Sequence, residues 1–114
     1  MDDLKSQLIK ILQEPKSLDS LENLNLLDNQ SPNNPLIKAC IIACKRINSI
    51  DFEKDIKYFA FLLSYQEISG KYFEDDSWVD KLSQSNTESL AIDLIDYLNL
   101  GLELKTDFLI DIKD

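Results

Sequence analysis

The stretch NPLIKACIIACKRINSIDFEKDIKYFAFLLSYQEISG, residues 34–70, contains two helix signals in succession and decides the fold class. Asn34 followed by Pro35 is a favourable helix start, because asparagine caps helices and proline suits the first helical position. The helix predicted from this start runs to about Asn48. Its apolar stripe consists of Leu36, Ile37, Cys40, Ile41, Cys44 and Ile47.

The second helix signal covers residues 52–69, with Asp51 as the predicted N-cap and Gly70 as the predicted end. Apolar side chains spread over much of the circumference of this helix. A helix that is apolar on so many sides belongs in the interior of a fold, so we expect it to be the central helix. Its apolar positions are Phe52, Ile56, Phe59, Ala60 and Leu63, extended by Phe61, Leu62 and Tyr65.

Apolar residues at helical spacing predict four flanking helices, at residues 2–14, 18–28, 75–83 and 87–100. Ser17 is the expected N-cap of the second of these, and Asn86 or Thr87 the expected cap of the last. The helix at 18–28 is expected to face the core through leucines that recur every three residues, namely Leu18, Leu21, Leu24 and Leu27.

Residues 102–114 allow two interpretations, a β-hairpin or a short helix from about Asp107. We favour the helix, because an isolated two-stranded hairpin needs a surface to pack on. The chain holds only two glycines and three prolines, too few for the many turns of a sandwich or barrel. The sequence therefore predicts an all-α fold, a single domain over residues 1–114 built as a compact bundle of five to six helices.

The charge of the chain limits its partners. It holds 12 basic and 21 acidic residues, a net charge of -9. Such a charge repels nucleic acids and anionic membranes and attracts basic proteins. We therefore expect a basic protein partner, with no direct binding of nucleic acid or membrane. The alternative is an ordinary acidic intracellular protein, since net charge bears on association and not on fold or role.

The cytoplasm is the expected compartment. The N-terminal residues MDDLKSQLIKIL open with acids and lack the apolar core of a secretion signal. Uninterrupted apolar runs are only a few residues long, far short of a membrane span. Cys40 and Cys44 form no disulfide framework, and they are expected to be buried apolar side chains rather than a redox pair or half of a metal site.

Several common chemistries are missing from the sequence. The chain has no histidine, so it lacks Ser-His-Asp and Cys-His systems and histidine-containing zinc sites. It also lacks the glycine-rich loops that hold phosphates. Asp93 and Asp96 lie three apart on one predicted helix face, where paired carboxylates can bind a cation or act as acid and base, but a solvated face is far commoner. We expect no enzyme activity, no metal and no cofactor.

One segment combines aromatic and acidic residues, and we predict that it binds the partner. Between Lys71 and Lys81 there is no positive charge. Aromatic side chains dominate the energy of many interfaces, and acids steer a basic partner and fix its register. The alternative is that Phe73 and Trp78 point into the core while the acids solvate a loop. The predicted partner-binding residues are Tyr72, Phe73, Glu74, Asp75, Asp76, Trp78, Asp80, Asp93 and Asp96.

The segment GKYFEDDSW, residues 70–78, resembles the acidic immunity proteins that protect bacteria from their own toxins. Among these, the inhibitors of DNase colicins are helical bundles with an aromatic pair close to an acidic stretch, and immunity proteins of contact-dependent inhibition systems are also similar in character. The resemblance covers these nine residues. It implies that Tyr72, Phe73 and the adjoining acids contact a toxin.

The favoured function is therefore an immunity protein that neutralises a basic bacterial toxin, a nuclease in the first instance, by covering its active or substrate-binding surface. One alternative is a phage- or plasmid-type acidic inhibitor of a host nucleic-acid-binding protein. Another is a helical adaptor or oligomer subunit, for which an exposed apolar stripe on the helix at 52–69 would be the supporting observation.

Overall fold

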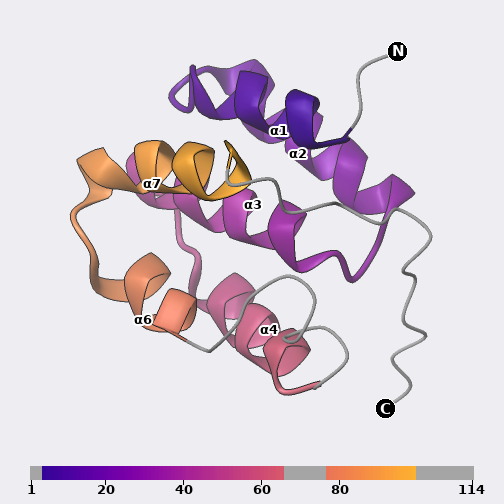
Figure 1. Cartoon of the computed structure of the whole chain (residues 1–114), viewed down its shortest axis with the longest axis vertical. Helices are drawn as coiled ribbons and strands as arrows, with labels where there is room; N and C mark the ends of the chain where they lie inside the picture. Colours follow the sequence, from indigo (N-terminus) through magenta and orange to yellow (C-terminus); the bar gives the residue numbers. More distant parts are fainter. Residues whose placement is uncertain (1–3, 66–76, 100–114) are drawn as a thin grey trace.

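The computed structural model describes residues 4–65 and 77–99, which form six helices and no strand. The predicted all-α bundle is confirmed, and Figure 1 shows α3 crossing its middle, with α1 and α2 on one side and α4 and α6 on the other. The tail at 102–114 lies outside the described residues. No helix within 4–65 or 77–99 has the length and apolar character that crossing a membrane requires. The helices are α1 (Leu4–Leu12), α2 (Leu18–Gln30), α3 (Pro35–Ile47), α4 (Glu53–Leu63), α6 (Ser77–Gln84) and α7 (Thr87–Asn99).

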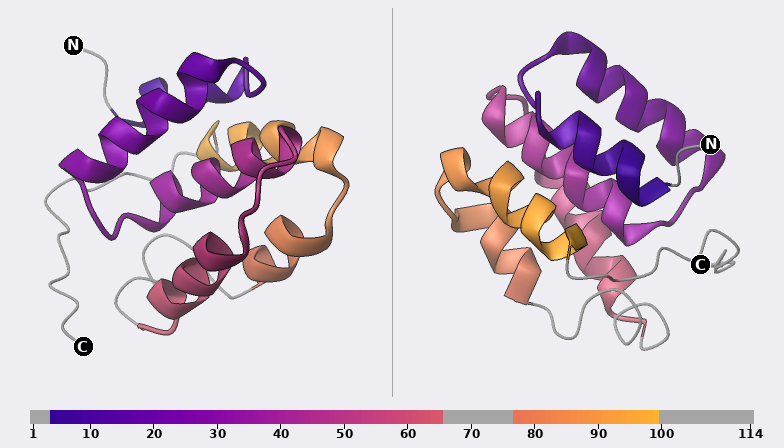
Figure 2. Two further views of the ribbon diagram at one scale, coloured as in Figure 1. Left: turned by 180° about the vertical axis from the view of Figure 1, so that it is seen from behind. Right: turned by 45° about the horizontal axis from the view of Figure 1, so that its top comes forward.

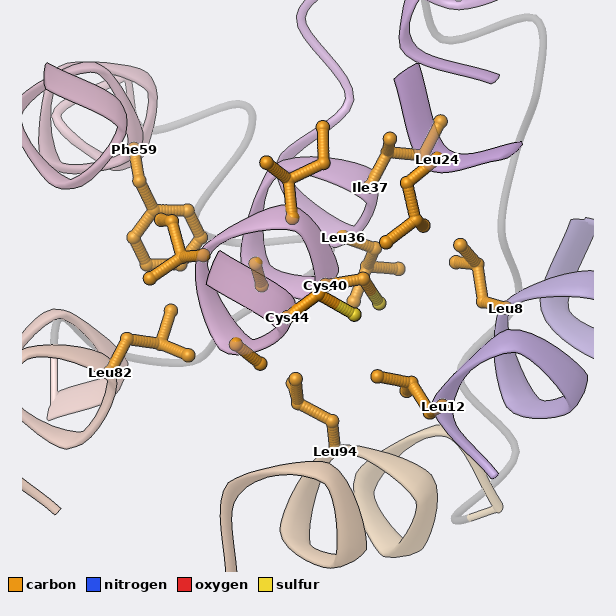
Figure 3. Packing of buried hydrophobic residues seen from close by; sticks show 14 of the residues in the cluster. Leu8, Leu12, Leu24, Leu36, Ile37, Cys40, Cys44, Phe59, Leu82 and Leu94 are labelled. Carbon is orange, nitrogen blue, oxygen red and sulfur yellow. The ribbon is translucent and has the colours of Figure 1, made fainter. Parts of the chain in front are cut away.

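The centre of the bundle is α3, which contacts each of the other five described helices. Nine of its 13 residues are buried, among them alanines and cysteines whose small side chains let neighbouring helices approach closely. Figure 3 shows Leu8 of α1, Leu24 of α2 and Leu94 of α7 converging on this helix. The burial of these apolar surfaces is the main force that holds the bundle together.

The prediction that the helix at 52–69 occupies the centre is wrong. Only three of the 11 residues of α4 are buried, because Lys54 and Lys57 give it a side that faces water. By contrast, residues 39–44 of α3 form an uncharged run that covers more than a full helical turn. The helix predicted at residues 52–69 is also shorter than expected, since α4 ends at Leu63.

Leu18 was predicted to lie on the buried face of α2, and this prediction is wrong, since its side chain is 87% exposed. A step of three residues turns a helix by about 300°, so a leucine every third position drifts around the axis. Leu24 is fully buried, whereas Leu21 and Leu27, one step to either side, are only partly buried. Two steps away, Leu18 lies about 120° from Leu24 and faces outward. Ser20, which was not among the predicted core positions, is buried and donates a hydrogen bond to the Glu14 carbonyl at 2.6 Å.

The predicted helix starts are largely confirmed. The Asn34 carboxamide accepts hydrogen bonds from two N–H groups in the first turn of α3, at 2.9 and 3.4 Å. Ser17 and Asn86 accept from the first turns of α2 and α7 at 3.3 and 3.0 Å. Asp51 was predicted to be the N-cap of α4, but Phe52 occupies that position and Asp51 precedes it. The Asp51 carboxylate still accepts a hydrogen bond from the Glu53 N–H, the first of the helix, at 3.1 Å.

The end of α3 is a Schellman motif built on a serine. Ser49 has a φ of 59°, in the left-handed region that favours glycine. Its N–H donates to the Arg46 carbonyl at 3.1 Å, and the Ile50 N–H donates to the Lys45 carbonyl at 2.7 Å. These two bonds satisfy carbonyls at the helix end and fix the direction in which Ile50 leaves it.

We expect Ser49→Gly to raise the free energy of unfolding by about 0.5–1 kcal/mol, because glycine has no Cβ to strain at positive φ. Urea unfolding followed by circular dichroism measures the change. The matched control is Ser64→Gly, since Ser64 has an ordinary φ of -69° and should lose stability on the same exchange. Equal changes at the two serines would contradict the prediction.

Candidate functional site

The predicted partner-binding residues fall into two groups. Tyr72, Phe73, Glu74, Asp75 and Asp76 lie outside the described residues. The remaining four lie on the last two described helices, with Trp78 and Asp80 on α6 and Asp93 and Asp96 on α7. The surface formed by these two helices is called the α6–α7 surface below.

Trp78 joins the two helices of this surface. Its ring meets the Tyr97 ring edge to face, with centroids 5.1 Å apart, and the ammonium of Lys81 lies 4.7 Å from its centre. Both aromatic rings are half-buried and pack against the core. Trp78 therefore packs against the core with one part of its ring and leaves another part accessible, so it is neither a fully buried nor a fully exposed residue.

The same contact places the start of α6 beside the end of α7. Trp78 belongs to the first turn of α6, and Tyr97 to the last turn of α7. The α6–α7 surface therefore lies at two ends of the described chain, Ser77 and Asn99. The sequence beyond these ends, residues 66–76 and 100–114, holds eight acidic and three basic residues.

The acids of the α6–α7 surface differ in their surroundings. Asp93 is half-buried and forms an ion pair with Lys81 at 3.5 Å, so the positive charge of Lys81 is offset within the fold. Asp80, Glu88 and Asp96 are exposed and have no ion pair among the described residues. The predicted pair Asp93 and Asp96 is therefore split: one carboxylate is used within the fold, and the other faces water.

Sequence reasoning missed Ile92, which is 60% exposed on α7. It lies between Glu88 and Asp96 at intervals of four residues, so the three side chains follow one another along the outer face of the helix. The signal was present in the sequence, because an isoleucine with an acid one turn before and one turn after lies on the polar side of the helix. The α6–α7 surface thus includes an exposed apolar residue flanked by carboxylates.

Most basic side chains on the middle helices are occupied within the fold. Asp55 of α4 lies 2.6 Å from Lys45 and 3.8 Å from Lys38, and Lys38 also approaches Asp28 at 3.6 Å. Residues 4–65 and 77–99 hold 11 acidic and nine basic side chains, a net charge of -2, and the rest of the chain holds the other -7. Most of the net negative charge of the chain therefore belongs to residues outside the described ranges.

Arg46 holds the α6–α7 corner in place. Its guanidinium donates hydrogen bonds to the carbonyls of Leu82 and Ser85, both at 2.7 Å, and lies 3.5 Å from the Lys81 carbonyl and 3.4 Å from the Thr87 hydroxyl. One side chain of α3 thus satisfies carbonyls at the end of α6 and reaches the first residue of α7. A planar group with several donors suits this task better than an ammonium does.

The two cysteines are free and buried in the core, as predicted. Figure 3 shows their sulfur atoms between α3 and the leucines of α1. Burial raises the pKa of the Cys44 thiol to about 11, and burial, with a smaller effect of Cys44, raises the pKa of Cys40 well above its ordinary value. Thiols in this state are poor nucleophiles and poor metal ligands.

These raised pKa values predict a loss of stability at high pH. The folded state keeps the Cys44 thiol protonated up to pH 11, whereas the unfolded chain releases the proton near pH 9. The contribution is therefore complete below pH 9 and is lost as the pH rises toward 11, by at most about 1.4 kcal/mol per pH unit for each thiol. We expect the unfolding free energy of Cys44→Ala to fall less steeply over this range in urea titrations. Parallel slopes for the variant and the parent would contradict the assignment.

In the part of the chain that the structure describes, no three cysteine or acidic side chains gather closely enough to hold a metal ion. The α6–α7 surface carries a half-buried aromatic pair, an exposed isoleucine and three exposed acids, and Arg46 bonds to the backbone that connects its two helices. No family model, curated protein or solved structure matches the chain. The arrangement of these side chains therefore carries the functional argument.

Proposed function

We propose that the chain is an immunity-type inhibitor, without catalytic activity, that neutralises a basic bacterial toxin of the nuclease class. The toxin docks on the α6–α7 surface, and the acids cover the site where it would bind its nucleic acid. The observation that carries the proposal is that three exposed acids of α6 and α7, Asp80, Glu88 and Asp96, have no ion pair among the described residues, and that these two helices are joined by the Trp78–Tyr97 contact.

Electrostatics and packing have separate roles in this mechanism. The field of the exposed acids speeds the encounter with a basic partner, an effect that salt screens. The Trp78–Tyr97 pair and Ile92 supply apolar contact, which slows dissociation. Because Lys81 is neutralised by Asp93, no described base on this surface opposes the approach.

Charge reversal tests the proposal. The tagged protein is used to capture partners at low salt from bacterial cells that express its neighbouring genes, and the bound protein is assayed for nuclease activity. We expect one basic protein whose nuclease activity is lost at one equivalent of inhibitor. Asp80→Lys and Asp96→Lys should each slow association by about three- to tenfold, with a weaker salt dependence than the parent shows.

The control is Glu53→Lys, which changes the net charge by the same amount on the exposed start of α4. It should leave the association rate within about twofold of the parent. The proposal fails if the protein captures only copies of itself, or if the three reversals have equal effects.

One observation favours a second candidate, a self-associating helical adaptor. Phe61 and Tyr58 on α4 are 39% and 38% exposed, with ring centroids 6.0 Å apart, and Tyr65 continues the row. Tyr58 is partly used within the fold, since it donates a hydrogen bond to Asn33 and lies near the Lys38 ammonium. Sedimentation of the parent and of Phe61→Ser would distinguish this candidate, because only the adaptor predicts an oligomer that the substitution dissociates.

A further inference from the structure

Three chain connections meet at one end of the bundle. The connections from α1 to α2, from α3 to α4 and from α6 to α7 lie on the same side in Figures 1 and 2. The Asn48 side chain ties the first two together by donating a hydrogen bond to the Pro15 carbonyl at 2.9 Å. Glu88, at the start of α7, lines a surface depression together with Pro15 and Ser17. The surface formed by residues 13–22, 48–52 and 85–88 is called the corner surface below.

An apolar hollow of about 400 Å³ lies on the corner surface, between the start of α2 and the connection from α3 to α4. Its apolar side chains are Leu18, Leu21 and Ile50, and its rim includes Glu22 and Asn25. Leu18 is 87% exposed and Ile50 41% exposed, although they are 32 positions apart in the sequence. Two exposed aliphatic side chains on one hollow form a place where an apolar side chain of a partner can be buried.

The hollow is built on fixed backbone. Ser17 caps α2 immediately before Leu18, and the two Schellman bonds hold the turn that presents Ile50. The Asn48 side chain also donates to the Cys44 carbonyl at 2.7 Å, which joins this turn to the end of α3. A site with a preformed backbone loses little conformational entropy when a partner binds.

The charge around the hollow selects the partner. The corner surface holds five acidic residues and one basic residue, Lys16. Glu14, Asp19, Glu22 and Glu88 are exposed, and none of them has an ion pair among the described residues. Two copies of this surface would repel each other, and an anionic membrane would be repelled as well. A basic segment with an apolar residue complements both the rim and the hollow.

We propose that the corner surface is a docking site for a basic protein segment that anchors an aliphatic side chain between Leu18 and Ile50. The site goes beyond the proposed function, because it is carried by the apolar hollow and not by the Trp78–Tyr97 pair. Glu88 lies where the two surfaces join, so a large partner can occupy both. The corner surface then supplies a second anchor, and the α6–α7 surface supplies the first.

The probes are two amphipathic helical peptides, one of lysine and leucine and one in which alanine replaces each leucine. Each is titrated into the isotopically labelled full chain and followed by amide chemical shifts. We expect the lysine–leucine peptide to shift the amides of residues 17–25 and 48–52. The lysine–alanine peptide should bind at least about tenfold more weakly, because it has no side chain to fill the hollow.

Variants locate the site. Leu18→Ser should weaken binding of the lysine–leucine peptide about tenfold, and Asp19→Lys combined with Glu22→Lys should weaken it further at low salt. The matched control is Leu26→Ser, because Leu26 is also an exposed leucine of α2, 58% exposed, but does not line the hollow. Leu18 makes little contact within the fold, so Leu18→Ser should unfold at the temperature of the parent.

The proposal is overturned if neither peptide binds, if both bind equally well, if Leu26→Ser matches Leu18→Ser, or if the shifts fall on other residues. It is also overturned if the chain forms dimers that Leu18→Ser dissociates, because the occupant is then a second copy. Asp80→Lys and Asp96→Lys should leave peptide affinity within about twofold of the parent. The peptide experiment therefore gives its answer whether or not the toxin proposal holds.

Discussion

Replacement of Phe59 by alanine is expected to lower the free energy of unfolding by about 3–5 kcal/mol, the largest effect of any single change considered for this chain. Phe59 has the largest fully buried side chain among residues 4–65 and 77–99. Figure 3 shows its ring pointing from α4 toward α3, with Leu82 of α6 on the same side. The alanine variant therefore leaves a cavity where three helices meet, and the loss is a large fraction of a typical domain's total stability.

Urea unfolding of the variant, followed by circular dichroism, measures this loss. Phe61→Ala is the matched control, since Phe61 lies two positions further along the same helix and is 39% exposed. It should cost about 1 kcal/mol or less. A similar loss at both positions would show that the side of α4 that faces the core has been assigned wrongly.

Replacement of Arg46 by alanine is expected to lower the free energy of unfolding by about 2–3 kcal/mol. The guanidinium satisfies carbonyls of Leu82 and Ser85 that the substitution would leave without these donors, and it also lies 5.6 Å from the centre of the Phe52 ring. Hydrogen bonds from a charged donor to partly buried acceptors are among the stronger ones in proteins. Beyond the loss of stability, the end of α6 and the start of α7 should exchange their amide protons faster than in the parent.

Arg46→Lys should recover less than half of the lost unfolding free energy. The planar guanidinium directs several N–H donors to separate carbonyls, which the compact ammonium of lysine cannot do. Lys54→Ala removes an exposed base that has no ion pair among the described residues, and it should be nearly neutral. If Arg46→Lys were as stable as the parent, charge alone would explain the contact, and the directed hydrogen bonds would not be needed.

Local signals in the sequence were reliable where one residue type determines the backbone. Asn34 with Pro35 predicted the start of α3, because the cap and the fixed φ of proline act within a single turn. The α-helical class followed from apolar spacing and from the scarcity of glycine. None of these features depends on which helix packs against which.

Positions that depend on tertiary packing were predicted less well. The many apolar and aromatic residues of α4 suggested a central helix. Large apolar side chains are buried, however, only on the face of the helix that packs against another helix. The small residues of α3, Ala39 and Ala43, are fully buried because they allow contact on several sides. No local pattern reveals that Arg46 reaches the carbonyls of Leu82 and Ser85, which lie 36 and 39 positions away.

The candidate site was predicted in part. Trp78 and Asp80 were identified from the density of aromatic and acidic residues, and the contact between Trp78 and Tyr97 came from the structure. Ile92 and Leu18 were missed as exposed residues, since a list of apolar positions does not say where the buried arc of a helix ends. Once the structure identifies Leu24 as fully buried, the helical angle places Leu18 about 120° away and outside the buried arc of α2.

The contacts of α3 have a consequence for how the protein opens. Every other described helix contacts α3. Displacing α3 would therefore remove part of the core packing of each of them at once. Unfolding should therefore be cooperative, with one transition by every probe. The amides of α3 should exchange with solvent only through global opening, so their exchange rates report the stability of the whole fold.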